Sequence, residues 1–279
     1  MKTRVKSSLI MAPLLLIVFL GGYFLLAGAI FFTILAIREY CSAFGEKRPA
    51  EWVLWASLCI LYGGSFIEQL QPFAILAIWL FISIVLCFIS MFSMEKRDLM
   101  QGMATIMGVV YIIFLLSHIV LIDKMFTEQY LYIGNFRISG LASYVWIVFL
   151  AAFGTDIFAF FTGKLFGRHK LIPSVSPKKT VEGSIGGIIG SVVLCGLFGY
   201  FFLDKEFLTC IIIGILGGVV SQLGDLSASV IKRKIGIKDW GTLIPGHGGI
   251  LDRIDSVLFT APLVFYILII KQFWAGAGL

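Results

Sequence analysis

The sequence predicts an all-α protein, a polytopic integral membrane helical bundle of about nine transmembrane helices, with eight as an alternative. Of its 279 residues, 59% are hydrophobic and 14% are charged, whereas an average soluble domain has about 25% charged residues. The apolar residues form long runs, and a helix of roughly 20 such residues crosses a bilayer core of about 30 Å. Backbone groups in lipid find no water, which favours helices over open strands.

Nine apolar segments are candidate spans: about 8–20, 23–40, 52–68, 72–94, 102–122, 142–163, 184–203, 207–230 and 256–272. The first two are short and are joined only by Gly21-Gly22, so one long or kinked helix is the alternative. The basic N-terminus continues into further apolar sequence without an Ala-x-Ala cleavage site, so we interpret it as an uncleaved first span.

The distribution of basic residues predicts the orientation. With a cytoplasmic N-terminus and nine spans, all but four of the 22 Lys and Arg residues fall on the inner side. The cytoplasmic loops of membrane proteins generally carry such an excess of Lys and Arg. The net charge of +6 therefore sets orientation and does not indicate nucleic acid as a partner. We expect a multi-pass protein of the cell inner (plasma) membrane whose active site faces the cytoplasm.

The charged motifs lie in one half of the chain. We divide the sequence into N-terminal transmembrane helices, 1–140, and a C-terminal catalytic transmembrane region, 141–279, whose cytoplasmic loops are 164–183 and 231–255. The five cysteines lie mostly in apolar runs, without a CxxC pair or metal-ligand spacing.

The first motif joins a carboxylate inside a span to a basic loop. Asp156 lies in apolar sequence, where an ionised group faces a cavity, a metal or a buried Lys or Arg. Downstream, Ser176-Pro-Lys-Lys-Thr-Val-Glu-Gly precedes a glycine-rich helix start, whose backbone N–H groups suit phosphate oxygens. The alternative is a positively charged inner loop with a helix cap.

The second motif places polar residues on one helix face. Gln222, Asp225, Ser229 and Lys232 or Arg233 are three or four residues apart. Such a stripe could also line a transport pathway. Asp252 and Asp255, again three apart, begin the last span at the same level, and three converging carboxylates would repel unless a cation such as Mg²⁺ joined them.

The histidines favour no zinc site. His247 is flanked by glycines that permit close backbone approach, but it lacks nearby Cys or His partners. We interpret His118, inside an apolar span, and His169, in a basic loop, as structural or solvated.

The pattern S-x-I-K-R-x4-K-D-x-G-x3-P-x-H-G-G-I-x-D-R-I-D over residues 229–255 resembles the signature of the phosphatidate cytidylyltransferases, or CDP-diglyceride synthetases. The upstream segments beginning at Ser176 and Gln222 resemble the same family. The resemblance covers about residues 150–272, and the first 140 residues match only in being apolar and multi-spanning.

The resemblance implies transfer of a cytidylyl group from CTP to phosphatidic acid, giving CDP-diacylglycerol and diphosphate, with Mg²⁺ and possibly a second cation, in a homodimer among membrane lipids. We expect Asp225 and Asp252 to be metal ligands, with Asp255 next. The expected catalytic residues are Asp225, Lys232, Arg233, Lys238, Asp239, His247, Asp252 and Arg253. The expected substrate-binding residues are Ser176, Lys178, Lys179, Thr180, Glu182 and Ser229.

Two other functions fit parts of the sequence. The acceptor could be another lipid phosphate, such as an isoprenoid one. An ion-coupled transporter could use the stripes at Asp156 and Asp225, but transporters often repeat interrupted segments in two related halves, and here the charge lies in one half.

Overall fold

Helices make up almost all of the structure, a computed structural model that describes residues 17–67, 71–92, 99–126, 131–133, 136–138, 143–203, 206–243 and 248–276. The described helices of the N-terminal half are α2 (Gly22–Ala43), α3 (Glu51–Gly64), α4 (Pro72–Met91), α5 (Leu99–Gly108) and α6 (Leu115–Phe126), with the short 3-10 helix η1 (Gly45–Lys47) after α2 and the π-helical turn η2 (Val109–Phe114) between α5 and α6. The helices of the C-terminal half are α7 (Ser143–Phe166), α8 (Val181–Phe202), α9 (Phe207–Lys234) and α10 (Leu251–Gly276).

The predicted multi-pass membrane fold is confirmed. Among the described residues, seven helices are long and apolar enough to cross a membrane, with α5, η2 and α6 forming one of them. The predicted span 52–68 corresponds to α3, which is shorter, at 14 residues. The predicted span 8–20 lies mostly outside the described residues, of which 17–20 are helical.

The helix is interrupted between the first two predicted spans. Gly21 and Gly22 have φ of 61° and 53°, a left-handed conformation that glycine adopts without steric cost. The N–H of Gly22 donates to Asp123 Oδ2 of α6 at 2.8 Å. The segment before Gly21 is therefore not a straight continuation of α2.

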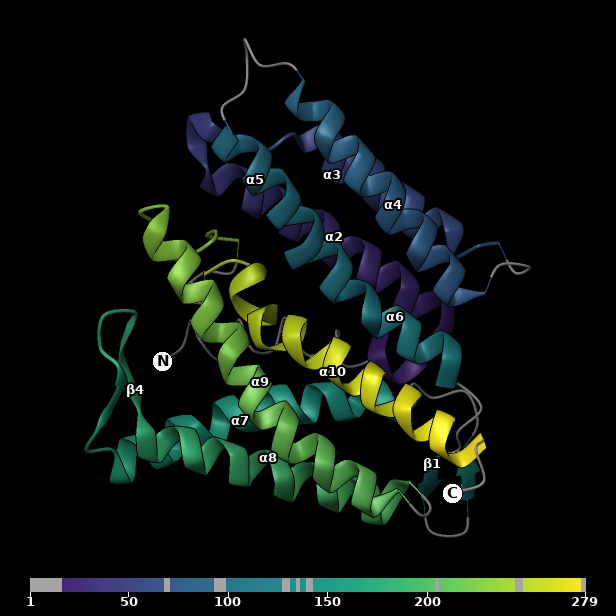
Figure 1. The fold of residues 1–279 in the computed structure, drawn as a ribbon. Helices are drawn as coiled ribbons and strands as arrows, with labels where there is room; N and C mark the ends of the chain where they lie inside the picture. The colour runs from purple at the N-terminus through teal and green to yellow at the C-terminus, as the bar shows by residue number, and fades with distance from the viewer. Residues whose placement is uncertain are drawn as a thin grey trace.

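Glycines allow the helices of the C-terminal half to approach closely. A methyl group at Gly187 of α8 would lie 2.9 Å from the carbonyl oxygen of Thr155 in α7, and one at Gly214 of α9 would lie 2.7 Å from Cα of Val192 in α8. Small residues at such positions are a general means of packing helices in membranes. They let α8 pack against both α7 and α9, in the lower part of the view in Figure 1. The glycine-rich start of α8 takes part in this packing; its expected role in receiving phosphate stays a prediction.

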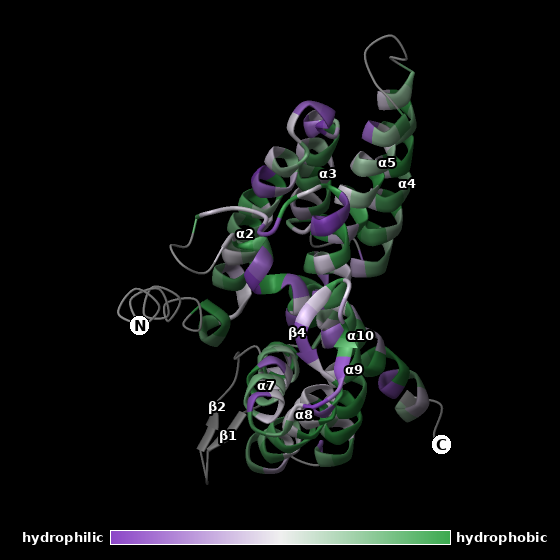
Figure 2. Ribbon diagram, turned by 90° about the vertical axis from the view of Figure 1, so that its left-hand side faces the viewer, coloured by the Kyte–Doolittle hydropathy of each residue, from purple (hydrophilic) through white to green (hydrophobic). Residues whose placement is uncertain are grey.

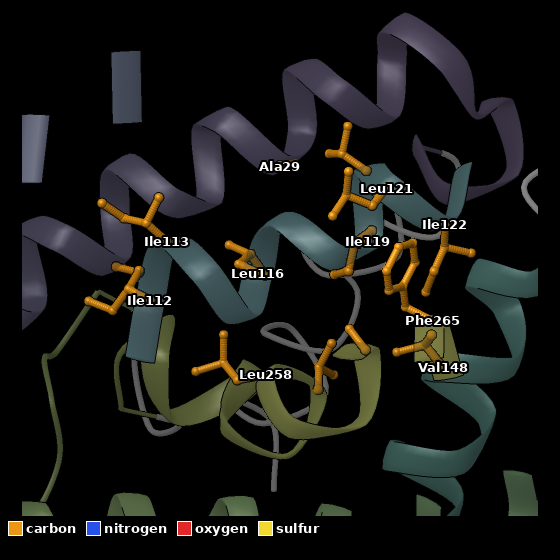
Figure 3. Close-up of a cluster of buried hydrophobic side chains, with 14 of the residues drawn as sticks. Ala29, Ile112, Ile113, Leu116, Ile119, Leu121, Ile122, Val148, Leu258 and Phe265 are labelled. Atoms are coloured by element: carbon orange, nitrogen blue, oxygen red, sulfur yellow. The ribbon is translucent and has the colours of Figure 1, made fainter. Parts of the chain in front are cut away.

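The buried core connects the two halves. Figure 3 shows Leu116 and Ile119 of α6 between Ala29 of α2 on one side and Leu258 of α10 on the other. Leu258 is fully buried. Because α10 packs against α6 as well as against α7 and α9, the N-terminal half directly supports the helix that carries the last charged motif.

Two short antiparallel ribbons interrupt the helical pattern, and the sequence had predicted neither. One pairs β1 (Leu131–Ile133) with β2 (Phe136–Ile138). The other pairs β3 (Lys170–Ile172) with β4 (Ser176–Thr180), and Lys170 lies opposite Thr180. Their strands of three to five residues are too short to show a pattern that distinguishes a strand from a loop in the sequence.

We predict that Gly214→Ala destabilises the protein by about 1–3 kcal/mol, because the added methyl group would overlap the α8 backbone. Thermal unfolding in detergent should show a lower Tm. Gly63→Ala in α3 is the matched control, since a methyl group there meets no atom within 4 Å; alanine's higher helix propensity should leave its Tm equal or slightly raised. Equal Tm values for both variants would contradict the close packing of α8 and α9.

Candidate functional site

A cavity of about 540 Å³ lies where the β3–β4 ribbon meets α7, α8, the end of α9 and the start of α10. Its size is typical of small-molecule sites. Figure 2 shows hydrophilic residues gathered around β4, beside α9 and α10, whereas most of the helix length is hydrophobic. The two predicted loops, 164–183 and 231–255, therefore contribute to one site.

The cavity wall carries equal numbers of opposite charges. Its acidic residues are Asp156, Asp225, Asp239, Asp252 and Asp255, and its basic residues are Lys164, Lys178, Lys179, Lys232 and Arg253. Carboxylate oxygens suit a hard cation, and ammonium and guanidinium groups suit phosphate oxygens. The cavity can therefore accept a polyphosphate together with a divalent cation.

Three of the carboxylates come from three different helices. Asp225 of α9 interacts repulsively with Asp156 of α7 and with Asp255 of α10. Asp156 Oδ2 accepts a hydrogen bond from Ser256 Oγ at 3.2 Å, and Asp255 Oδ1 accepts one from the Ser256 N–H at 2.8 Å. Asp156, for which the sequence left open a cavity, a metal or a buried Lys or Arg, belongs to the wall of the site.

Asp225 forms an ion pair with the ribbon. Lys179 Nζ of β4 lies 2.5 Å from Asp225 Oδ2, and both side chains are about a quarter exposed (27% each). The lysine provides the charge compensation that a cation would otherwise supply. A metal or a phosphate that entered the cavity would compete with this pair for Asp225 or for Lys179.

Asp252 has a different environment, because each of its oxygens already has partners. Oδ1 lies 2.6 Å from Lys232 Nζ, and the two side chains are 5% and 11% exposed. Oδ2 accepts hydrogen bonds from the N–H groups of Trp240 and Gly249, at 2.8 and 2.9 Å. Asp252 therefore fixes the segment between α9 and α10 as well as facing the cavity.

The ribbon is attached to the start of α8 by the side chains of Thr180 and Glu182. Thr180 caps α8 by accepting a hydrogen bond from the N–H of Gly183 at 3.1 Å. Glu182 accepts hydrogen bonds from the backbone N–H groups of Arg168 and His169, at 3.0 and 3.2 Å, and lies 2.6 Å from Nδ1 of the His169 ring. Glu182 therefore holds the end of α7 beside the start of α8.

The structure brings together most of the predicted site residues. Nine of them line the cavity: Lys178, Lys179, Thr180, Asp225, Lys232, Asp239, Asp252, Arg253 and Asp255. Five others in the described part of the chain lie outside its lining: Ser176, Glu182, Ser229, Arg233 and Lys238. Arg233 is exposed and donates instead to the carbonyl oxygen of Ile237. His247 lies outside the described residues.

No three Asp, Glu, His or Cys side chains of the described residues are placed to hold one metal ion together. The predicted trio of Asp225, Asp252 and Asp255 is therefore not preformed. Asp252 is engaged by Lys232 and two amides, while Asp225 and Asp255 remain near one another beside Asp156. Mg²⁺ generally binds to one or two carboxylates plus substrate phosphates, so the acidic pair meets its requirement without a third ligand.

One residue of this region was missed in the sequence. Glu39, near the end of α2, is buried and accepts hydrogen bonds from the backbone N–H groups of Ile250 and Leu251, at 2.8 and 2.9 Å. The available signal was a carboxylate inside the predicted span 23–40, which is costly without a partner. Its partner could not be found from sequence because it lies more than two hundred positions away.

Comparisons with known proteins agree on one family. The model of the cytidylyltransferase family matches residues 2–271. A phosphatidate cytidylyltransferase of Synechocystis sp. is 34% identical over 272 residues, covering 90% of each chain. One from Staphylococcus haemolyticus is 30% identical, covering 96% of this chain and 97% of its own. One from Thermotoga maritima is 31% identical, covering 96% of each.

We predict that Lys232→Met destabilises the protein by about 3–5 kcal/mol, because it leaves the carboxylate of Asp252 buried without its counter-ion. Thermal unfolding in detergent checks this, and Lys232→Met combined with Asp252→Asn should be less destabilising than Lys232→Met alone. Arg48→Met is the matched control: its ion pair with Glu51 is exposed and should contribute at most about 1 kcal/mol. If Lys232→Met and Arg48→Met lowered the free energy of unfolding by similar amounts, the pair of Lys232 and Asp252 would not stabilise the fold.

Proposed function

The chain belongs to the cytidylyltransferase family, and from this we propose that its cavity is where CTP reacts with phosphatidic acid. The protein is a nucleotidyltransferase that forms CDP-diacylglycerol and diphosphate. One observation supports this assignment. The wall of the cavity, whose volume is about 540 Å³, combines carboxylates with basic side chains, and both charged loops contribute to it.

The reaction requires alignment more than proton transfer. An oxygen of the phosphatidate phosphate monoester, already negatively charged, forms a bond to the α-phosphorus of CTP. The bond between that phosphorus and the oxygen that bridges to the β-phosphate breaks, and diphosphate leaves with the electron pair. Catalysis then depends on in-line positioning and on neutralising charge on the leaving group.

The basic residues of the cavity would bind the phosphates. Lys178 and Lys179 approach from β4, Lys232 from the last turn of α9, and Arg253 from the first turn of α10. Arg253 Nε is buried without a hydrogen-bond partner among the described residues, as expected for a group whose partner is a ligand. Arginine suits bidentate contacts to phosphate, so Arg253 is the strongest candidate for the triphosphate.

Asp225 and Asp255 are the residues that would hold Mg²⁺, with Asp156 beside them. Their mutual repulsion favours a cation between them, and Mg²⁺ would supply charge neutralisation for the phosphates. Asp252 would then act mainly through its fixed contacts to Lys232, Trp240 and Gly249. This changes the emphasis of the prediction from sequence, in which Asp252 ranked equally with Asp225.

The membrane setting supports the lipid substrate. The cavity lies at the end of the bundle that carries both basic loops, and positively charged loops face the cytoplasm in membrane proteins. We propose that the site opens to the cytoplasm at the inner membrane, where it meets a soluble nucleotide and a lipid phosphate. A homodimer remains part of the proposal, on the resemblance described above.

The first test follows a labelled phosphate. We predict that purified protein in detergent, given phosphatidic acid and Mg²⁺, transfers label into lipid from CTP labelled at the α-phosphate but not from CTP labelled at the γ-phosphate, and releases diphosphate. Transfer of the γ-label would indicate a lipid kinase and would overturn the proposal. Transfer only to an added isoprenoid phosphate would assign a different acceptor.

We predict that Asp225→Asn lowers kcat by at least about 100-fold, because it removes a carboxylate from the proposed cation site. Its Tm should stay close to that of the unaltered protein, since the side chain is partly exposed and its ion-pair partner Lys179 can be solvated. Glu51→Gln, which changes an exposed carboxylate at the start of α3, is the matched control and should keep full activity. An Asp225→Asn enzyme with near-normal turnover would exclude Asp225 as a metal ligand.

A further inference from the structure

Glu39 connects the N-terminal half of the protein to the wall of the cavity. Its two carboxylate oxygens accept hydrogen bonds from consecutive backbone N–H groups, those of Ile250 and Leu251, at 2.8 and 2.9 Å. These groups lie at the start of α10, where backbone N–H groups have no partner within the helix. A carboxylate at a helix N-terminus also interacts favourably with the helix dipole. Glu39 therefore caps α10 from another helix.

The same carboxylate also fits closely against two glycines. A methyl group added at Gly241 would lie 2.8 Å from Glu39 Oε1, and one at Gly249 would overlap both oxygens. Gly241 lies near the middle of the segment that joins α9 to α10, residues 235–250, and Gly249 lies near its end. Glu39 thus contacts this segment at two separate places, and only glycine leaves room for it at these two positions.

Asp252 binds the same segment from its other side. Its Oδ2 accepts hydrogen bonds from the N–H groups of Trp240 and Gly249. Gly249 is therefore held between two carboxylates, with Glu39 packed against its Cα and Asp252 bonded to its N–H. The ring of Tyr40, next to Glu39, packs against Trp240 with centroids 5.7 Å apart. Residues 39 and 40 together fix the position of the segment relative to α2.

The cost of burying Glu39 indicates that its position matters. Only 9% of the residue is exposed, and an ionised carboxylate in a membrane protein is expensive unless it is paired. Asp252, another carboxylate, lies close enough to repel it. A leucine or glutamine would fill such a space without burying a charge, whereas a carboxylate offers a separate acceptor oxygen to each of the two amides.

We infer that Glu39 is a positioning residue for cytidylyl transfer, acting through Gly249 and the first turn of α10 on Asp252, Arg253 and Asp255. This inference rests on the proposed function. Glu39 does not line the cavity and is not a catalytic residue. It sets where α10 begins, and so where the three charged side chains of its first two turns stand relative to Asp225 and Lys179 on the facing elements.

The test is Glu39→Gln, which keeps the size of the side chain but turns one acceptor into a donor facing a backbone N–H. We predict a kcat reduced about 10- to 100-fold per folded molecule, since displacements of about 1 Å can cost this much. The KM for CTP should change by less than about threefold, as expected when alignment and not binding is lost. Glu51→Gln, a carboxylate lost from the first turn of α3, is the control and should retain full kcat.

A second readout is independent of activity. Hydrogen exchange of the Ile250 and Leu251 amides, followed by mass spectrometry of the peptide over residues 248–256, should be at least about tenfold faster in Glu39→Gln than in Glu51→Gln. If Glu39 served stability alone, the variant would show a lower Tm but normal kcat per folded molecule and a normal KM. That result would overturn the inference.

Gly249→Ala provides a further variant that keeps the inference testable if Glu39→Gln does not fold. Its methyl group would displace the Glu39 carboxylate, so kcat should fall in the same way. The variant that combines Glu39→Gln with Gly249→Ala should have a kcat no lower than the less active single variant, because both changes disrupt one contact. A kcat reduced by the product of the two single effects would contradict the coupling. If the unaltered enzyme itself transferred no cytidylyl group, the proposed function would fail, whereas an active enzyme insensitive to Glu39→Gln would refute only this inference.

Discussion

The buried ion pair of Lys232 and Asp252 is the interaction on which the rest of the site depends. Charges at the end of an apolar bundle are stable only when each is compensated, and this pair compensates two of the ten that line the cavity. Asp252 also accepts hydrogen bonds from Trp240 and Gly249, so the pair holds the segment between α9 and α10 in place. Without it the cavity would lose one wall.

The surrounding helices make this arrangement possible in two ways. Glycines in α8 and α9 let three helices approach within backbone contact, which brings Asp156 near Asp225. On the other side, α6 and α2 support α10 through the buried core (Figure 3), and Glu39 caps its first turn. The N-terminal half therefore does more than anchor the protein in the membrane: it sets the position of the last charged helix.

Much of this could be predicted from sequence because the signals are local. Apolar runs between charged loops predict helices and their approximate ends, and the α4 and α9 helices begin at the predicted residues. Of the helix face predicted from spacing, Gln222, Asp225 and Lys232 line the cavity, whereas Ser229 and Arg233 do not. The β3–β4 ribbon was not predicted, since its pairing depends on a register between short strands. Glu39 was not predicted either, because its partners are distant in sequence.

The sequence by itself determined the membrane class, the family and which residue types would form the site, because hydrophobicity and motif spacing are written in consecutive residues. Only the tertiary structure decided how the carboxylates divide their roles. Asp225 faces Asp156 and Asp255 across helices, whereas Asp252 is bound by a lysine and two amides. These differences depend on which partners come within hydrogen-bonding distance when the helices pack. The spacing of residues along the chain does not predict such contacts between different helices.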